Sequence, residues 1–309
     1  MVFFGNHQGS CPDPQSDSFV LACTSDFATD VFPLYRPSNS RLTSWHHVAN
    51  AFPVNHQPYW AIPAPVGRFW APDLHRVNGN WVLYFAAEQR SSGSFVIGVA
   101  WGRALKTIWT HTRVLHYVGQ FNAFNPSYHR EIYGGVIDPA EAKDPNTGQR
   151  YLVWSEQHSS IWAAPLTDDG LDIRGNKVSM IMHVQSPTDC EVNSCVVEGS
   201  ALTFHNGLAY LLYSVRSTWD WSYAMRAAWS HNPLSFYRSF PGYILRAGNG
   251  WSGPGGGAAP VRVGKNRWVE FYHALRGPDQ SHISSFRMLM MGSLVWHGLR
   301  PVINGGIAG

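Results

Sequence analysis

The chain consists largely of short, strand-like runs that end in tight turns. Each run has four to eight residues and is rich in Val, Tyr, Trp, Phe and Leu, as in WVLYFAA, FVIGVAW, YLVWSE and AYLLYSV. Two of the turns are Asn-Gly pairs, at residues 78–79 and 206–207. Because both central residues of a type I′ turn need a positive φ, an Asn-Gly between two such runs indicates a β-hairpin. The pattern predicts an all-β chain with little helix.

Acidic residues next to Pro or Gly recur at a nearly constant interval. Asp13, Asp73, Asp138 and Glu198 precede turn-and-strand patterns at steps of 60, 65 and 60 residues, and one more step reaches the Gly-rich stretch 248–260. Five such units fit five four-stranded blades around a channel, whereas an irregular sandwich would have no such period. We therefore predict a single five-bladed β-propeller domain over residues 1–309, with a pocket at one end of the channel.

Composition restricts the partners of such a domain. Apolar residues make up 44% of the chain and charged residues only 14%, so a large core is expected. The net charge is +3 and the basic residues are scattered, which predicts neither nucleic acid nor an acidic membrane as a partner. No run approaches the roughly 18 apolar residues of a membrane helix. We expect a monomer.

The N-terminus and the cysteines bear on the compartment. MVFFGNHQGSCPDP does not read as a signal peptide, because no basic region precedes an apolar core. The four cysteines form two locally close pairs, Cys11 with Cys23 and Cys190 with Cys195. These pairs fit two disulfides of a secreted protein, or four ordinary small core residues.

Five short motifs, in order and one blade apart, resemble glycoside hydrolase family 43. They are CPDP (11–14), RFWAPDL (68–74), the stretch beginning GGVIDPAEAKDP (134–145), VVEGSALTF (196–204), and WVEFYHA (268–274) with the following SFRMLMM (285–291). The resemblance implies a propeller enzyme that inverts the anomeric centre. By position, Asp13 would be the general base and Glu198 the general acid. Asp138 would orient the acid and tune its pKa.

Two departures from the family pattern border the same loops. Ser200 stands where the family usually has Pro after Glu-Gly, and Gly256 stands where His is common. Neither change removes one of the three carboxylates. Both bear on substrate preference.

The chemistry needs acids of this kind. A carboxylic acid must protonate the leaving oxygen while a carboxylate about 6.5–9.5 Å away activates water, and a third carboxylate helps to keep the acid protonated. Taken alone, Asp13 and Asp138 would be turn residues, since Asp often closes turns through its side chain. Glu198 follows the apolar run CVV, where a solvated role is harder to explain.

Four further residues are predicted to contact substrate. His273 lies in an apolar run and is either a core histidine or, as the resemblance implies, a residue at the channel floor that holds water or a calcium ion. Arg287, among apolar residues, is expected to pair with a pocket carboxylate or a sugar hydroxyl, or else to form a structural salt bridge. Trp70 and Phe32 could stack on a sugar ring or fill the core. No cofactor is required, and a structural calcium is the one metal considered.

The sequence therefore predicts a secreted glycosidase acting on arabinan, arabinoxylan or oligosaccharides derived from them. An exo-acting α-L-arabinofuranosidase is preferred. The alternatives are a β-xylosidase or an endo-1,5-α-L-arabinanase on the same scaffold. A carbohydrate-binding propeller without catalysis, or a purely structural one, would have no need for three acids.

Overall fold

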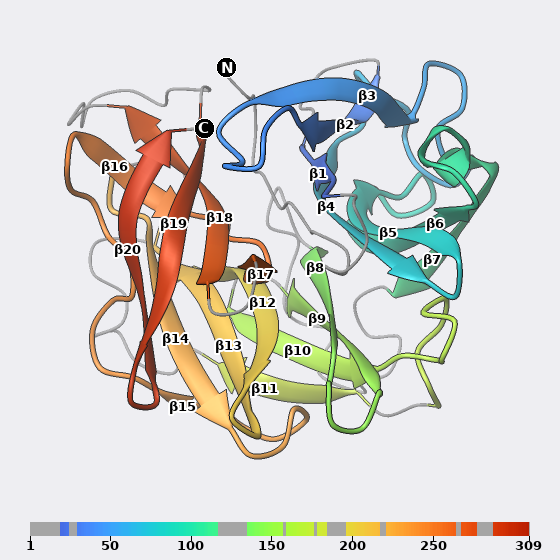
Figure 1. Cartoon of the computed structure of the whole chain (residues 1–309). Helices are drawn as coiled ribbons and strands as arrows, with labels where there is room; N and C mark the ends of the chain where they lie inside the picture. Colours follow the sequence, from blue (N-terminus) through green and yellow to red (C-terminus); the bar gives the residue numbers. More distant parts are fainter. Residues whose placement is uncertain are drawn as a thin grey trace.

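The structure is a computed structural model that describes residues 19–24, 30–116, 135–156, 159–175, 178–183, 196–216, 221–263, 267–276 and 287–308. Five antiparallel sheets stand around a common centre, in chain order (Figure 1). The predicted five-bladed β-propeller is confirmed. The prediction of one domain over residues 1–309 stays a prediction.

Each blade is a run of consecutive strands joined as hairpins. Blade 1 has β1 (Leu21–Ala22), β2 (Val31–Pro37) and β3 (Trp45–Phe52). Blade 2 has β4 (Phe69–Val77), β5 (Asn80–Glu88), β6 (Phe95–Gly102) and β7 (His111–His116), with the 3₁₀ turn η1 (Leu105–Thr110) before β7. Blade 3 has β8 (Val136–Lys143), β9 (Arg150–Glu156), β10 (Ser160–Pro165) and β11 (Ser179–His183).

The last two blades follow the same plan. Blade 4 has β12 (Val197–His205), β13 (Leu208–Val215), β14 (Ala224–Ser230) and β15 (Arg238–Ser239). Blade 5 has β16 (Trp251–Gly255), β18 (Arg267–Arg276), β19 (Met288–His297) and β20 (Arg300–Ala308), and β17 (Val261–Val263) also pairs with β18. Among the described residues no helix is long and apolar enough to cross a membrane.

The predicted Asn-Gly hairpins are present. Asn78 and Gly79 have φ of 48° and 84° and join Val77 to its partner Asn80. Asn206 and Gly207 have φ of 48° and 78° and join His205 to Leu208. Local turn chemistry thus set the ends of the innermost hairpins of blades 2 and 4.

The core is divided among the blade interfaces. One apolar cluster fills each of the five interfaces, and the cluster between blades 5 and 1 packs Leu21 and Trp45 against Phe271 and Leu289. Because this last cluster joins the two ends of the described chain, the ring is closed by side-chain packing. Burial of apolar surface at every interface is what holds the blades in a ring.

The innermost strands of blades 2 to 5 share one β-bulge. The register shifts between Trp70 and Asp73, between Ile137 and Ala140, between Glu198 and Ala201, and between Ser252 and Gly255. The second residue of each bulge is left-handed: Ala71 (φ 50°), Asp138 (54°), Gly199 (56°) and Gly253 (54°). A bulge re-aims the side chains beside it and is common next to active sites.

This bulge corrects the repeat phase taken from the sequence. Glu198 is the first residue of its bulge, Asp138 is the second, and Asp73 is the fourth. The three acids are therefore not equivalent in the repeat. An alignment on neighbouring Pro and Gly could not separate positions that differ by one or two residues, although each step points the side chain elsewhere.

Asp73 lies in a buried charge network between blades 2 and 3. His75 Nε2 is 2.8 Å from Asp73 Oδ2, and His75 Nδ1 is 3.0 Å from Glu141 Oε2. Arg150 Nη1 is 2.8 Å from Glu141 Oε1, and the Glu141 amide donates to Asp73 Oδ2 at 2.6 Å. Burial lowers the pKa of His75, but the Asp73 and Glu141 carboxylates outweigh it and raise the pKa to about 10.

This network makes stability depend on pH. His75 keeps its proton in the folded state up to about pH 10 but loses it in the unfolded state above its ordinary pKa of 6.5. Its contribution is thus fully present below pH 6.5 and disappears as the pH rises to about 10. We expect His75→Gln to lower the free energy of unfolding at pH 6 by about 3–5 kcal/mol, because it strands buried carboxylates. Denaturant titrations at pH 6, 8 and 10 should show the difference in unfolding free energy between wild type and variant becoming smaller. A difference that stays constant would contradict a charged His75, and the exposed His46→Gln is the control.

Glu270 is a buried acid of the opposite kind. It has no exposed surface, and its carboxylate oxygens make no hydrogen bond to a described residue. The absence of a side chain on Gly257 leaves it room, since a Cβ there would lie 2.4 Å from Glu270 Oε1. Burial raises its pKa well above the ordinary value of 4.5.

A raised pKa in an acid means that the folded state holds a proton which the unfolded state releases. Stability then falls as the pH rises above 4.5. We expect Glu270→Leu and Glu270→Gln to remove this fall in stability. The unfolding free energy of each variant minus that of the wild type should then increase with pH by up to about 1.4 kcal/mol per pH unit. Thermal unfolding between pH 4.5 and 8 measures it. Parallel curves for the wild type and both variants would show that Glu270 is ionised in the fold.

Candidate active site

Asp138 connects blade 3 to blade 4 at the bulge. Its φ is 54°, a left-handed value that Asp tolerates better than most residues but that still costs about 1–3 kcal/mol. The side chain is buried, and its Oδ2 accepts a hydrogen bond of 2.8 Å from the amide of Gly199. Gly199 is itself left-handed and follows Glu198 directly. The structure therefore brings Asp138 next to the backbone that carries Glu198.

Glu198 is held by a residue that the sequence did not point to. Its Oε1 accepts a hydrogen bond of 2.9 Å from the Tyr223 hydroxyl, and both side chains are buried. Burial raises the pKa of Tyr223 well above its ordinary value, and the charges of Glu198 and Asp138 raise it further. Tyr223 therefore stays protonated and acts as a donor. Nothing in SYAMRAAW distinguishes it from a core tyrosine.

Tyr223 is fixed in turn by His273 and Arg287. Its ring lies parallel to the His273 imidazole, with 5.8 Å between centroids and 3° between planes. The Arg287 guanidinium carbon is 5.4 Å from the centroid of the same ring. Arg287 and His273 are both buried. Two residues predicted to contact substrate thus lie around the tyrosine that bonds Glu198.

Arg287 determines the tautomer of His273. Arg287 Nη1 lies 2.8 Å from His273 Nδ1 and donates to the Gly253 carbonyl at 2.8 Å. Because a guanidinium can only donate, Nδ1 must be the acceptor and the ring proton lies on Nε2. A Cβ on Gly256 would lie 2.3 Å from Nε2. The glycine at the position where the family often has His therefore makes room for this imidazole.

This tautomer disfavours His273 as a metal ligand, because the protonated Nε2 has no lone pair for an ion and Ca²⁺ prefers oxygen. Within the described ranges, no three His, Cys, Asp or Glu side chains gather in a way that could hold a metal ion. The calcium considered from the sequence stays a prediction.

The two aromatic candidates differ in position. Trp70 is half-buried and stacks on Phe95 with 4.3 Å between centroids, beside Ile137, the residue before Asp138. Phe32 has no exposed surface and packs among Phe52, Phe69 and Phe85. Its predicted role of stacking on a sugar is therefore not supported, because the ring is enclosed in the core between blades 1 and 2.

Two other predictions concern the general base and the cysteine pairs. Asp13, the predicted base, lies outside the described residues, as do Cys11, Cys190 and Cys195. Cys23 is a buried free thiol, and burial raises its pKa well above the ordinary value. Of the two readings of the cysteines, the small core residue is the one that Cys23 fits.

Comparison with known families decides what this cluster belongs to. The profile of glycosyl hydrolases family 43 matches residues 8–298. The chain belongs to this family. Membership confirms the resemblance carried by the five motifs, and with it the predicted enzyme class, a glycosidase.

One named relative is similar to part of this chain. Alpha-L-arabinofuranosidase 43 of Humicola insolens is 28% identical over 206 residues, which are 61% of this chain and 39% of that protein. The chain thus spans well under half the length of this relative.

Solved structures share the fold. A thermostable family-43 glycoside hydrolase has a TM-score of 0.76 at 17% identity and covers 100% of this chain and 95% of its own. The xylan beta-1,4-xylosidase of Bacillus halodurans C-125 has a TM-score of 0.75 at 16% identity, with coverage of 97% and 55%. The Cellvibrio cellulosa alpha-L-arabinanase complexed with arabinohexaose has a TM-score of 0.70 at 17% identity, with coverage of 97% and 96%.

Tyr223→Phe tests the bond to Glu198. The phenyl ring keeps the contacts to His273 and Arg287 but leaves a buried carboxylate oxygen without its donor, which costs about 1–3 kcal/mol. We expect kcat on a glycoside substrate to fall about tenfold or more, with KM changed less than about threefold.

The matched control is Tyr213→Phe. Tyr213 is a buried tyrosine whose hydroxyl forms a hydrogen bond of 3.2 Å with Ser239 in β15, the outermost strand of blade 4. It should lower thermal stability by a similar amount and leave kcat unchanged. Equal effects of the two variants on kcat would mean that Tyr223 acts only through stability.

Proposed function

We propose that the chain is an inverting glycosidase that hydrolyses arabinose- or xylose-containing plant cell-wall polysaccharide or oligosaccharide, and that it acts as an exo-acting α-L-arabinofuranosidase. Membership of the family supports the reaction class. The single structural observation that carries the proposal is the junction of Asp138 and Glu198 through the Gly199 amide, inside a buried polar cluster. Burying acids costs free energy, and buried acids gather at functional sites, which favours a catalytic role for this pair.

In this proposal Glu198 is the general acid that protonates the leaving glycosidic oxygen. The Tyr223 hydroxyl at 2.9 Å restricts its carboxyl group to one orientation while the second oxygen, Oε2, serves the substrate. Arg287 and His273 hold Tyr223 in place from behind. Preorganisation of this kind lowers the cost of aligning the acid with the bond that breaks.

Asp138 is proposed to be the positioning residue for that acid. Its carboxylate accepts the Gly199 amide and so fixes the backbone next to Glu198. Asp13 is proposed to be the general base that removes a proton from the attacking water, about 6.5–9.5 Å from Glu198 as inversion requires. Trp70, half-buried beside the bulges, is proposed to form one wall for the sugar.

The arabinofuranosidase assignment is favoured by the name of the relative from Humicola insolens. A second candidate is endo-acting arabinanase activity, which the similar propeller complexed with arabinohexaose favours. A β-xylosidase is the third. A polymeric substrate would be met outside the cell, so secretion is part of the proposal.

The first experiment compares leaving groups. Wild type and Glu198→Gln are assayed on nitrophenyl α-L-arabinofuranoside, nitrophenyl β-D-xyloside and arabino-oligosaccharides. Nitrophenolate leaves without much help from an acid, whereas a sugar alkoxide must be protonated. We therefore expect kcat/KM of Glu198→Gln to fall about 10²–10⁴-fold on the oligosaccharide and clearly less on the nitrophenyl glycoside.

Asp13→Asn should lower both rates alike, since water must be activated whatever the leaving group. The exposed Asp168→Asn is the control and should change neither. Equal losses on both substrates with Glu198→Gln would exclude the acid role. Hydrolysis of polymeric arabinan alone would move the assignment to the endo-acting candidate.

A further inference from the structure

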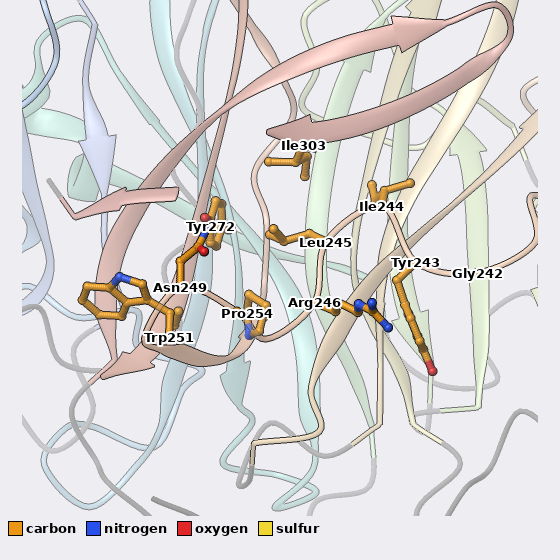
Figure 2. Close-up of a pocket in the computed structure, with 12 residues that line it drawn as sticks. Gly242, Tyr243, Ile244, Leu245, Arg246, Asn249, Trp251, Pro254, Tyr272 and Ile303 are labelled. Carbon is orange, nitrogen blue, oxygen red and sulfur yellow. The ribbon is translucent and has the colours of Figure 1, made fainter. Parts of the chain in front are cut away.

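A pocket lies between blades 4 and 5, separate from the residues of the candidate active site. Its volume is about 580 Å³, and it is lined mainly by the connection from β15 to β16 together with residues of blade 5 (Figure 2). We call it the blade 4–5 pocket and define it by Tyr243, Arg246, Asn249, Trp251, Pro254 and Tyr272. None of Asp138, Glu198, Tyr223, His273 and Arg287 lines it.

The wall of this pocket is preformed. The connecting segment is hydrogen-bonded to blade 4 through Met225 and Leu245 (2.9 Å), and to blade 5 through Ile303 and Ile244 (3.1 Å). Its rim is a two-residue hairpin turn at Asn249 (φ 53°) and Gly250 (φ 80°), closed by Gly248 and Trp251. A site bonded to both blades needs little ordering when a ligand binds, which favours affinity.

The lining combines flat aromatic faces with polar groups. Tyr243 and Trp251 are half-buried, and Tyr272 is only 2% exposed. The Arg246 and Asn249 side chains are exposed and form no hydrogen bond or ion pair with other described residues. The Trp251 indole can stack on the C–H face of a sugar ring, while a guanidinium and an amide bind its hydroxyl groups. Tyr243, with Arg216 5.3 Å from its ring centroid, and the enclosed Tyr272 complete the wall.

Other ligand classes fit this lining less well. None of the described residues that line the pocket is Asp or Glu, so a metal cation would find no carboxylate among them. Arg246 is the single charged residue in the part of the lining that the structure describes, so a ligand with several phosphates would have one partner there. A wholly apolar ligand would gain nothing from Arg246 and Asn249. A neutral, hydroxyl-rich ring uses both kinds of surface.

The pocket and the candidate active site share one wall. Pro254 borders the pocket, and the carbonyl of the preceding Gly253 accepts the hydrogen bond from Arg287. Strand alternation sends the side chains of Tyr272 and His273 to opposite faces of β18. The pocket therefore adjoins the β16 bulge that binds Arg287 and is separate from the candidate active site.

We propose that the blade 4–5 pocket is a non-catalytic binding site for a pentose oligosaccharide. Its ligand class rests on the proposed function, because a glycosidase acting on pentose polymers meets such chains at high local concentration. Occupation of this site would keep a polymer on the enzyme between cleavage events. It would raise affinity for long chains and leave the hydrolysis of small substrates unaffected.

Calorimetric titration with arabinohexaose and xylohexaose tests the site in the Glu198→Gln protein, which retains the pocket. With one of the two sugars we expect two binding events per protein molecule, one at the active site and one at the blade 4–5 pocket. Arg246→Ala and Trp251→Ala should each weaken one event by about tenfold or more and leave the other unchanged. Arg103→Ala, at an exposed arginine of blade 2, is the matched control and should weaken neither.

Trp251 begins β16, so its replacement could disturb the fold. Arg246→Ala and Asn249→Ala alter exposed side chains that have no hydrogen-bond or ion-pair partner among the described residues, so they keep the test valid. One binding event per chain, or two that both stay within about twofold in these variants, would overturn the proposal.

Activity separates this inference from the proposed function. In the active protein, Arg246→Ala should raise KM for polymeric arabinan or xylan about threefold or more and leave kcat/KM for a nitrophenyl glycoside unchanged. If the wild type hydrolyses none of the substrates but binds a hexaose that Arg246→Ala releases, the proposed function fails and the pocket stands. If the wild type hydrolyses a substrate but the variants keep its hexaose affinity and its KM, the proposed function stands and the pocket proposal fails.

Discussion

The left-handed residue inside each innermost strand is the constraint on which the site depends. Ala71, Asp138, Gly199 and Gly253 occupy it in blades 2 to 5. A regular strand would alternate its side chains between the two blade interfaces and would direct none of them to the central axis. The bulge turns the backbone toward the neighbouring blade instead, so that the Gly199 amide reaches Asp138 of blade 3 and the Gly253 amide reaches the Trp221 carbonyl of blade 4.

Strain at these positions is offset by contacts between blades. Asp138 is the acidic residue among the four, and its carboxylate accepts a hydrogen bond from the Gly199 amide of the next blade. The five apolar clusters between blades supply the burial that keeps such a conformation in place. Packing and catalysis are thus linked through the backbone: the interfaces hold the bulges, and the bulges aim the acids.

Three buried acidic sites inside this ring are held in different ways. The His75, Asp73, Glu141 and Arg150 network balances two cations against two anions between blades 2 and 3. Glu270 makes no hydrogen bond to a described residue, and burial raises the pKa of its carboxyl group well above the ordinary value. Glu198 differs from both, because its Oε1 accepts a hydrogen bond from a neutral hydroxyl. A neutral donor can orient a carboxyl group without requiring it to keep its charge, which suits a residue that must give up a proton.

The sequence by itself determined the features that depend on neighbouring residues. Asn-Gly turns, short strand runs and a period near 60 residues led to hairpins, to an all-β chain and to five blades, because each signal acts within a few residues or repeats along the chain. The ordered motifs led to the family and to Asp138 and Glu198 as candidates. What only the tertiary structure decided involves residues far apart in sequence.

Tyr223 meets Glu198 across 25 positions, Asp138 meets Gly199 across 61, and Phe32 joins the aromatic core of a second blade. The same holds for the blade 4–5 pocket, whose wall combines a loop after blade 4 with side chains of blade 5. Such contacts follow from how bulged strands stack around the ring. A shift of one residue, too small to see in an alignment of short motifs, redirects every side chain that follows.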